Sequence, residues 1–122
     1  MGIFSAHQID PAEIERSFGP VLIEGERVLV AFKAVRDTAF LTTHRFVLVD
    51  VQGLSGSKVA VQSVPYRSIV RFSVESAGTF DIDSDLHIWA SGMASPLTVK
   101  ISREADSQAI LRLLSEQVLA KR

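Results

Sequence analysis

The sequence contains no cysteine. Disulfide bonds, catalysis by a thiolate and structural zinc sites built on cysteine are therefore excluded together. It also lacks the run of roughly 20 apolar residues that a membrane-spanning helix needs. The first ten residues, MGIFSAHQID, contain no basic segment followed by a long apolar stretch, so no secretory signal is expected. We expect a soluble, cytoplasmic protein.

An excess of positive charge is absent as well. The 122 residues include 13 lysines and arginines against 14 aspartates and glutamates, for a net charge of −1. Proteins that bind nucleic acid usually show a basic excess or a basic stripe, so this partner is not expected. With 47% hydrophobic and 22% charged residues, the chain is predicted to form one globular domain with its own core.

The N-terminal segment, residues 1–25, is predicted to be helical. Asp10 is a favourable N-cap, and Pro11 suits the first helical position. Ile14 and Phe18 are four residues apart and share one face, so we expect both to pack on the rest of the domain.

Residues 26–102 are predicted to form about seven short strands. The segments are RVLVAFKA, two strands within TAFLTTHRFVLVDV, then KVAVQSV, SIVRFSVES, LHIWAS and LTVKIS. Apolar residues alternate with others along several of them, which is the period of a strand. The alternation puts Val28 with Val30 on one face of the first strand, and Val70 with Phe72 on one face of the fifth.

The last segment, residues 103–122, changes to helical spacing. Ile110, Leu113, Leu114 and Val118 recur every three or four residues, and no glycine or proline interrupts them. The fold class is therefore mainly β (α+β), with a bent antiparallel sheet whose open end this helix covers.

Three aspartates at alternate positions, Asp81, Asp83 and Asp85, resemble the start of a calcium-binding loop. Such a loop needs glycine at its sixth position and glutamate at its twelfth, and the sequence has Leu86 and Gly92 there. No metal site is predicted. We expect the aspartates to be solvated or to cap nearby N–H groups.

No catalytic group is predicted. The histidines His7, His44 and His87 have no visible acid partner, and GLSGS is only a near match to a nucleophile elbow. We expect no enzyme activity and no cofactor. If the protein were an enzyme, the polar residues to test first would be Arg45, Tyr66 and Glu75.

Trp89 is the only tryptophan. Alternation along its strand places it opposite Leu86, Ile88 and Ala90, so one of the two sets lies outside the core. Two alternatives stay open: Trp89 is an exposed contact residue, or it packs under the N-terminal segment.

Residues 35–92 resemble the bacterial pleckstrin-homology domain family. The resemblance is carried by VRD, by Thr42 to Arg45, by D-x-QG-x-x-G-x-K at Asp50 to Lys58, by PYRSI, by FSVE-x-AG-x-FD-x-D and by IW-x-SG. His44 stands where a lysine is usual. The rest of the chain is similar more loosely.

The resemblance implies a single PH-like domain over residues 1–122, with a bent seven-stranded antiparallel sheet or partly open barrel capped by a C-terminal helix. It also implies a non-catalytic protein that assembles into a homo-oligomeric ring of about five subunits, because edges that pair head-to-tail can close. A polar surface where neighbouring strands meet is expected to bind other proteins. The residues predicted for this interaction surface are Arg45, Asp50, Gln52, Lys58, Tyr66, Glu75, Asp81, Asp83 and Trp89.

The alternative is an adaptor that binds lipid headgroups at a membrane surface. PH domains that bind phosphoinositides carry several basic residues around the first hairpin. The segment FKAVRDTAF has only Lys33 and Arg36, offset by Asp37. A nearly neutral chain gains little from an anionic membrane, so lipid is the less favoured partner.

Overall fold

The computed structural model describes residues 6–35, 37–53, 57–76 and 83–120. The strands are β1 (His7–Ile9), β2 (Val28–Lys33), β3 (Thr38–Thr42), β4 (Arg45–Gln52), β5 (Lys58–Pro65), β6 (Ile69–Glu75), β7 (Ser84–Ala90) and β8 (Leu97–Ile101). The α-helices are α1 (Pro11–Ser17) and α2 (Ser107–Val118), and two short 3-10 turns are η1 (Gly19–Val21) and η2 (Tyr66–Ser68).

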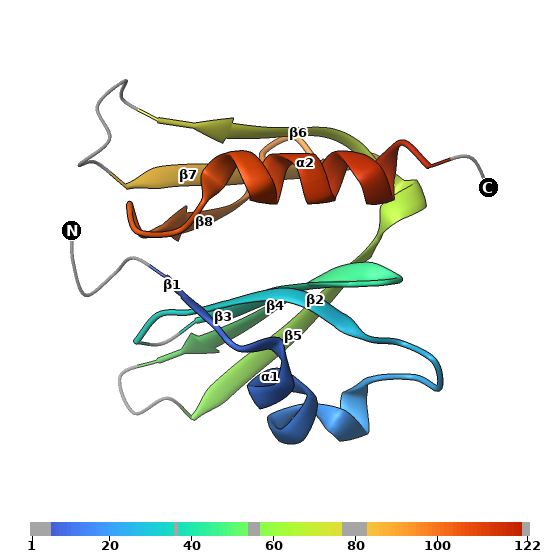
Figure 1. Ribbon diagram of the computed structural model, residues 1–122, viewed down its shortest axis with the longest axis vertical. Helices are drawn as coiled ribbons and strands as arrows, with labels where there is room; N and C mark the ends of the chain where they lie inside the picture. Colours follow the sequence, from blue (N-terminus) through green and yellow to red (C-terminus); the bar gives the residue numbers. More distant parts are fainter. Residues whose placement is uncertain (1–5, 36, 54–56, 77–82, 121–122) are drawn as a thin grey trace.

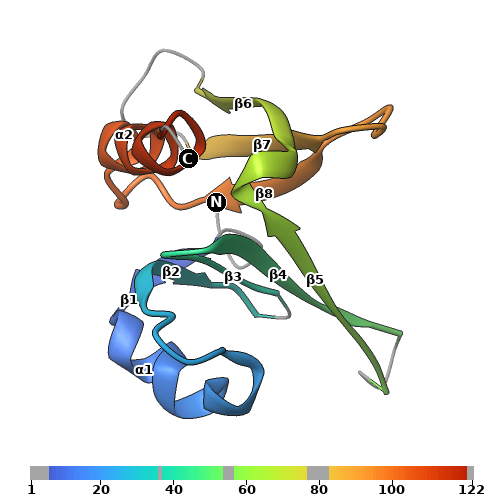
Figure 2. The same ribbon diagram turned by 90° about the vertical axis from the view of Figure 1, so that its right-hand side faces the viewer.

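Two antiparallel sheets face each other (Figures 1 and 2). One has five strands in the order β1-β2-β3-β4-β5, and the other has three in the order β6-β7-β8. The mainly β fold with a closing helix is confirmed. The strand count and the single sheet are corrected: the described residues form eight strands, in two sheets that do not close into a barrel. The extra strand, β1, has only three residues, which is too short for a visible alternation.

The sheets are joined at two places. After β5 the chain passes through η2 directly into β6. On the other side, Ala6 forms a parallel bridge to β8: its N–H donates to the Lys100 carbonyl at 2.7 Å, and its carbonyl accepts from the Ser102 N–H at 2.9 Å. The N-terminal segment therefore pairs with both sheets.

The main core lies between the sheets. Strands β2, β3 and β4 contribute side chains such as Phe32, Leu41 and Phe46, and the three-stranded sheet contributes others such as Leu86 and Ile88. Helix α2 closes the core with Ile110 and Leu114. The helix is shorter than the predicted 103–122, because Asp106 caps it by accepting from the Ala109 N–H at 3.0 Å.

Helix α1 covers the opposite face of the five-stranded sheet. Asp10 caps it as predicted, accepting from the Ala12 N–H at 3.0 Å. Ile14 and Phe18 both pack on the sheet, which confirms their shared face. The ring centroids of Phe18 and Phe40 are 5.7 Å apart. The five-stranded sheet is therefore buried on both faces at its centre, which a simple in-out alternation does not anticipate.

Register irregularities overturn two predicted faces. The pairing of β2 with β3 shifts between Val28 and Val30, so Val28 packs under α1 while Val30 enters the main core. In β6 the shift falls between Ile69 and Arg71. Val70 is therefore 68% exposed, whereas Phe72 packs against the core. An extra residue in one strand turns the following side chains to the other face.

Candidate functional site

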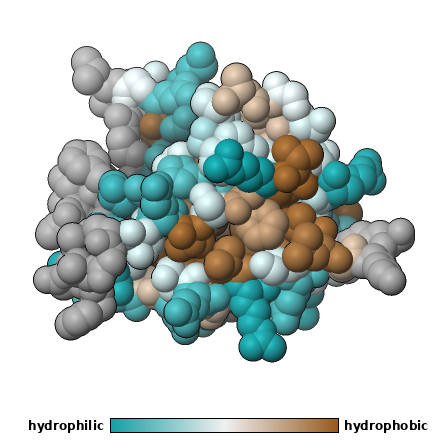
Figure 3. Space-filling view, turned by 90° about the horizontal axis from the view of Figure 1, so that it is seen from above, coloured by the Kyte–Doolittle hydropathy of each residue, from teal (hydrophilic) through white to brown (hydrophobic). Residues whose placement is uncertain are grey.

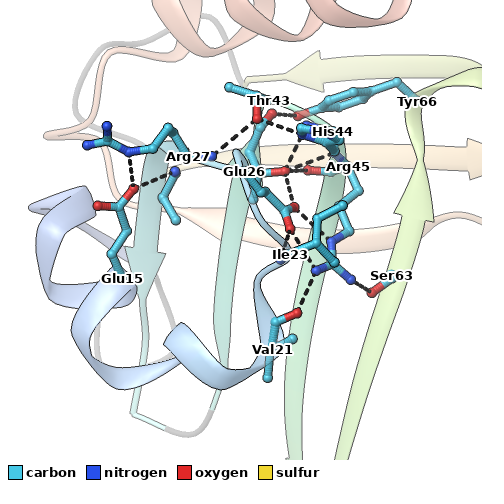
Figure 4. Close-up of polar contacts among 12 residues, drawn as sticks. Glu15, Val21, Ile23, Glu26, Arg27, Thr43, His44, Arg45, Ser63 and Tyr66 are labelled. Atoms are coloured by element: carbon cyan, nitrogen blue, oxygen red, sulfur yellow. Dashed lines mark hydrogen bonds and ion pairs between the residues drawn. The ribbon is translucent and has the colours of Figure 1, made fainter.

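Arg45 and Tyr66 lie in a polar network at one end of the five-stranded sheet (Figure 4). Its centre is Glu26, which is 5% exposed and follows a turn in which Gly25 has a φ of 84°. Arg45 binds both carboxylate oxygens of Glu26, with Nε–Oε2 at 2.8 Å and Nη2–Oε1 at 2.9 Å. This two-point geometry is the strongest form of the arginine–carboxylate pair.

Three further hydrogen-bond donors extend the network. The Thr42 hydroxyl donates to Glu26 Oε2 at 2.6 Å, and the Ile23 N–H donates to Oε1 at 3.1 Å. Burial alone raises the pKa of Glu26, but the hydrogen bonds from Arg45, Thr42 and Ile23 outweigh it and lower the pKa to about 2. The buried Tyr66 hydroxyl donates to the Thr42 carbonyl at 2.6 Å. These groups are committed to each other within the fold.

Asp50, Gln52 and Lys58 lie at the distal end of the β4–β5 hairpin. Gln52 stands opposite Lys58 in register, and its amide donates to Asp50 Oδ2 at 2.9 Å. The structure keeps these three predicted residues together, but far along the hairpin from Arg45, which pairs with Pro65 at the other end.

Strand β5 is one of the two edge strands of the five-stranded sheet, and within the described residues no strand pairs with its outer side. Val61 stands opposite Val49 and Val59 stands opposite Val51, so both lie on the face that α1 covers. The helix does not cover these two valines: Val59 is 55% exposed and Val61 is 46% exposed. An apolar row therefore continues from the covered part of the sheet onto its open edge.

Glu75 and Trp89 both lie on the outer face of the three-stranded sheet and line the same hollow. The guanidinium carbon of Arg71 lies 4.3 Å from the centre of the Trp89 ring, and the His87 ring is 5.8 Å away. Leu86 and Ile88 are in the core, so Trp89 is on the other face and half-buried. It packs on Arg71 and His87. A hollow of about 410 Å³ opens beside these side chains.

The same face carries the only group of metal-ligating side chains found among the described residues. One ligand atom each from Glu75, Asp85 and His87 lie within 4.8 Å of one another. His87 Nε2 is 3.1 Å from Glu75 Oε1, and its Nδ1 is 3.0 Å from the Thr98 hydroxyl. Lys100 Nζ is 3.1 Å from Asp85 Oδ1.

Asp83 precedes β7 and accepts from the Arg103 N–H at 2.9 Å. This confirms the expectation that an aspartate of this segment caps a backbone N–H group. Asp81 lies outside the described residues. His44 is in the β3–β4 turn with Nδ1 2.7 Å from the Thr43 hydroxyl.

A profile of the bacterial PH domain family matches residues 1–118. The chain belongs to that family. The uncharacterised protein YjqA of Bacillus subtilis strain 168 is 46% identical over 103 residues, covering 84% of this chain and 82% of YjqA.

Two solved structures show the same fold. A DUF1696-family protein with a pleckstrin-homology domain from Shewanella loihica PV-4 has a TM-score of 0.83 and 34% identity, covering 93% of this chain and 97% of that one. A pleckstrin homology domain from Shewanella amazonensis SB2B has a TM-score of 0.74 and 38% identity, with 92% and 90% covered. The PH-like fold expected from the resemblance is confirmed.

In this PH-like domain the hairpin between β2 and β3 is where the sequence predicted a headgroup-binding protein to carry basic residues. Lys33 pairs with Thr38 across the hairpin, and the Ala34 N–H donates to the Asp37 carbonyl at 2.8 Å. Lys33 is exposed, whereas Arg36 lies outside the described residues. No helix in the described part of the chain is long and apolar enough to span a membrane.

Sequence reasoning missed the partners of two important side chains. Glu26 is 19 residues from Arg45, and Glu75 is 12 residues from His87, so neither pairing is visible as a spacing motif. The expectation that the histidines lack an acid partner was wrong for His87, because strand pairing supplies one. The sequence placed Glu75 and His87 on predicted strands, but it placed Asp85 before the strand LHIWAS, so it gave no signal that the three residues meet.

Proposed function

We propose that this PH-like domain is a non-catalytic interaction module that assembles with copies of itself into a ring and presents a polar surface to other proteins. The observation that carries the proposal is the edge strand β5. An edge strand offers a row of unpaired N–H and C=O groups, which invites pairing with another chain.

Strand β5 has few of the features that protect an edge. Charged residues and prolines normally discourage edge pairing, and β5 has them only at its ends, in Lys58 and Pro65. The six residues between, VAVQSV, carry no charge and include the exposed Val59 and Val61. Such a segment is an aggregation hazard if it stays open. Specific pairing with a neighbouring subunit removes that hazard.

Head-to-tail pairing of this edge with a different surface of the next subunit is heterologous, and it closes into a ring when the rotation per subunit fits. Lys58 begins the edge strand β5, and Asp50 and Gln52 lie on the paired strand β4, so all three would lie close to the interface between subunits. Asp83 lies just before β7 and the half-buried Trp89 lies on β7, in the other sheet. In a ring, Asp83 and Trp89 of one subunit could lie beside the hairpin residues of the next subunit and form one surface with them.

The test measures molar mass in solution by light scattering on a sizing column, over a range of concentrations. The wild-type chain of 13.4 kDa should elute at about five chain masses. Replacing both edge valines, Val59→Lys and Val61→Lys, should give monomers, because two charges on the edge oppose strand pairing. The control is Val35→Lys, a more exposed valine in a hairpin loop, which should leave the mass unchanged.

Each other outcome has a definite meaning. A wild-type monomer at every concentration rejects self-assembly. A dimer rejects the ring, because two subunits do not form the closed assembly of about five chains. Equal disruption by Val35→Lys removes the role assigned to β5. Sedimentation with anionic vesicles in place of assembly would favour the headgroup-binding adaptor instead.

A further inference from the structure

The outer face of the β6–β7–β8 sheet places two carboxylates directly opposite each other. Glu75 on β6 pairs in register with Asp85 on β7, and His87 follows two residues later on the same face. Like charges directly opposite on neighbouring strands destabilise a sheet. A cation between them would remove this repulsion. We propose that Glu75, Asp85 and His87 form a binding site for a divalent zinc ion.

The ligand atoms are nearly in place. They lie within 4.8 Å of one another, whereas ligands on one zinc ion at bond lengths near 2.0–2.2 Å are roughly 3–3.5 Å apart. Small rotations of the exposed Glu75 side chain close that difference. All three residues are on paired strands rather than on loops, so their backbone positions are fixed by the ladder.

The histidine is oriented as a zinc-ligating imidazole usually is. Its Nδ1 is 3.0 Å from the Thr98 hydroxyl on the adjacent strand, and a second hydrogen bond of this kind fixes the ring and its tautomer. The other nitrogen, Nε2, points at Glu75 Oε1 across 3.1 Å. A zinc ion would take the place of this contact and bind both atoms.

Lys100 is the competing cation. Its Nζ contacts Asp85 Oδ1 at 3.1 Å, and half of its side chain is exposed, so it can move away into solvent. Removing Lys100 should therefore strengthen metal binding. Removal of a ligand should instead weaken zinc binding, so the two kinds of variant change the affinity in opposite directions.

The ligand types select the ion. One imidazole nitrogen with two carboxylates suits zinc, while calcium and magnesium prefer oxygen ligands in larger numbers. The hollow of about 410 Å³ beside Glu75 and His87 leaves room for water at the remaining position. Of the aspartates that resemble a calcium loop in the sequence, Asp85 takes part in this site, whereas Asp83 accepts from the Arg103 N–H.

The experiment is calorimetric titration of the chelator-treated full chain with zinc chloride. We expect one zinc ion per chain. His87→Gln and Asp85→Asn should each weaken the affinity by more than about tenfold, and Lys100→Met should strengthen it. The matched control is His7→Gln. His7 also stands near a glutamate, Glu104, at 3.8 Å, but the described residues place no third ligand beside this pair, so its loss should change nothing.

Melting curves without zinc verify that each variant is folded. Several outcomes would overturn the proposal. They are no binding by the wild-type chain, equal affinity after His87→Gln, the same loss after His7→Gln, or weaker binding after Lys100→Met. The site is independent of ring assembly, because the monomeric Val59→Lys/Val61→Lys variant should bind zinc as the wild type does.

Discussion

At the residue scale, Glu26 shows how a buried charge becomes part of the fold. Its side chain is fully buried, and an isolated carboxylate there would be strongly unfavourable. Arg45, Thr42 and the Ile23 N–H supply hydrogen bonds to both oxygens. The Arg45 guanidinium also holds Ser63 and the Val21 carbonyl. One ion pair thus connects the segment before β2 with β3, β4 and β5.

Acid should remove this stabilisation in a defined window. The pKa of Glu26 is lowered from 4.5 to about 2 by folding, so its contribution is fully present above pH 4.5 and is lost as the pH falls towards 2. The shift corresponds to about 3 kcal/mol. Chemical denaturation at pH 7 should show a loss of about this size for Glu26→Gln.

The control is Glu24→Gln, an exposed neighbour, which should change stability by less than about 0.5 kcal/mol. Between pH 4.5 and 2 the stability of Glu26→Gln should fall less steeply than that of the wild type. Parallel curves for the two proteins across this window would contradict the assignment.

At the element scale, helix α2 is held by one apolar stripe. Ile110 and Leu114 are buried against both sheets, while Leu119 beyond its end is 71% exposed. Seen from above, hydrophobic residues form a band across the face that α2 and β6 share, bordered by hydrophilic ones (Figure 3). An isolated helix of 12 residues is only marginally stable in water. Helix α2 therefore depends on the packing of Ile110 and Leu114 in the main core.

Shortening a buried residue of α2 should cost far more than shortening an exposed one. Leu114→Ala leaves a cavity between the helix and the sheets and should lower the free energy of unfolding by about 2–5 kcal/mol. Leu119→Ala should change it by less than about 0.5 kcal/mol. Urea denaturation of both variants provides the measurement, and similar effects for the two would show that α2 is not anchored through Leu114.

At the scale of the whole molecule, the two sheets depend on a short N-terminal connection. Ala6 bridges to β8 while β1 pairs with β2. The opposite side is joined by the chain itself through η2. The two sheets are therefore connected on two sides of the main core, but they do not form a closed barrel around it.

Replacing Ala6 with proline should loosen the connection. Proline has no N–H to donate to the Lys100 carbonyl, and the loss of one buried hydrogen bond costs about 1–3 kcal/mol. Hydrogen exchange of the Ser102 amide, which donates to Ala6, should accelerate more than that of the amides of β3. Equal acceleration throughout would mean that the bridge is not a local connection.

Much of the fold follows from local patterns in the sequence. The existence of strands β2 to β8, the N-cap Asp10 and the helical spacing around Leu114 depend on neighbours within a few residues. Chain-local physics is enough to predict such features. The motifs of residues 35–92 were likewise sufficient to indicate the PH-like family.

Only the tertiary structure decided the contacts between distant segments. The pairing of Arg45 with Glu26, the meeting of Glu75, Asp85 and His87, and the exposure of Val59 and Val61 all depend on which strands become neighbours. The bulges at Leu29 and Val70 changed which faces are buried, because one extra residue reverses the alternation. Strand β1 was also set by pairing, since three residues gain a strand conformation from the partner strand and not from their own pattern.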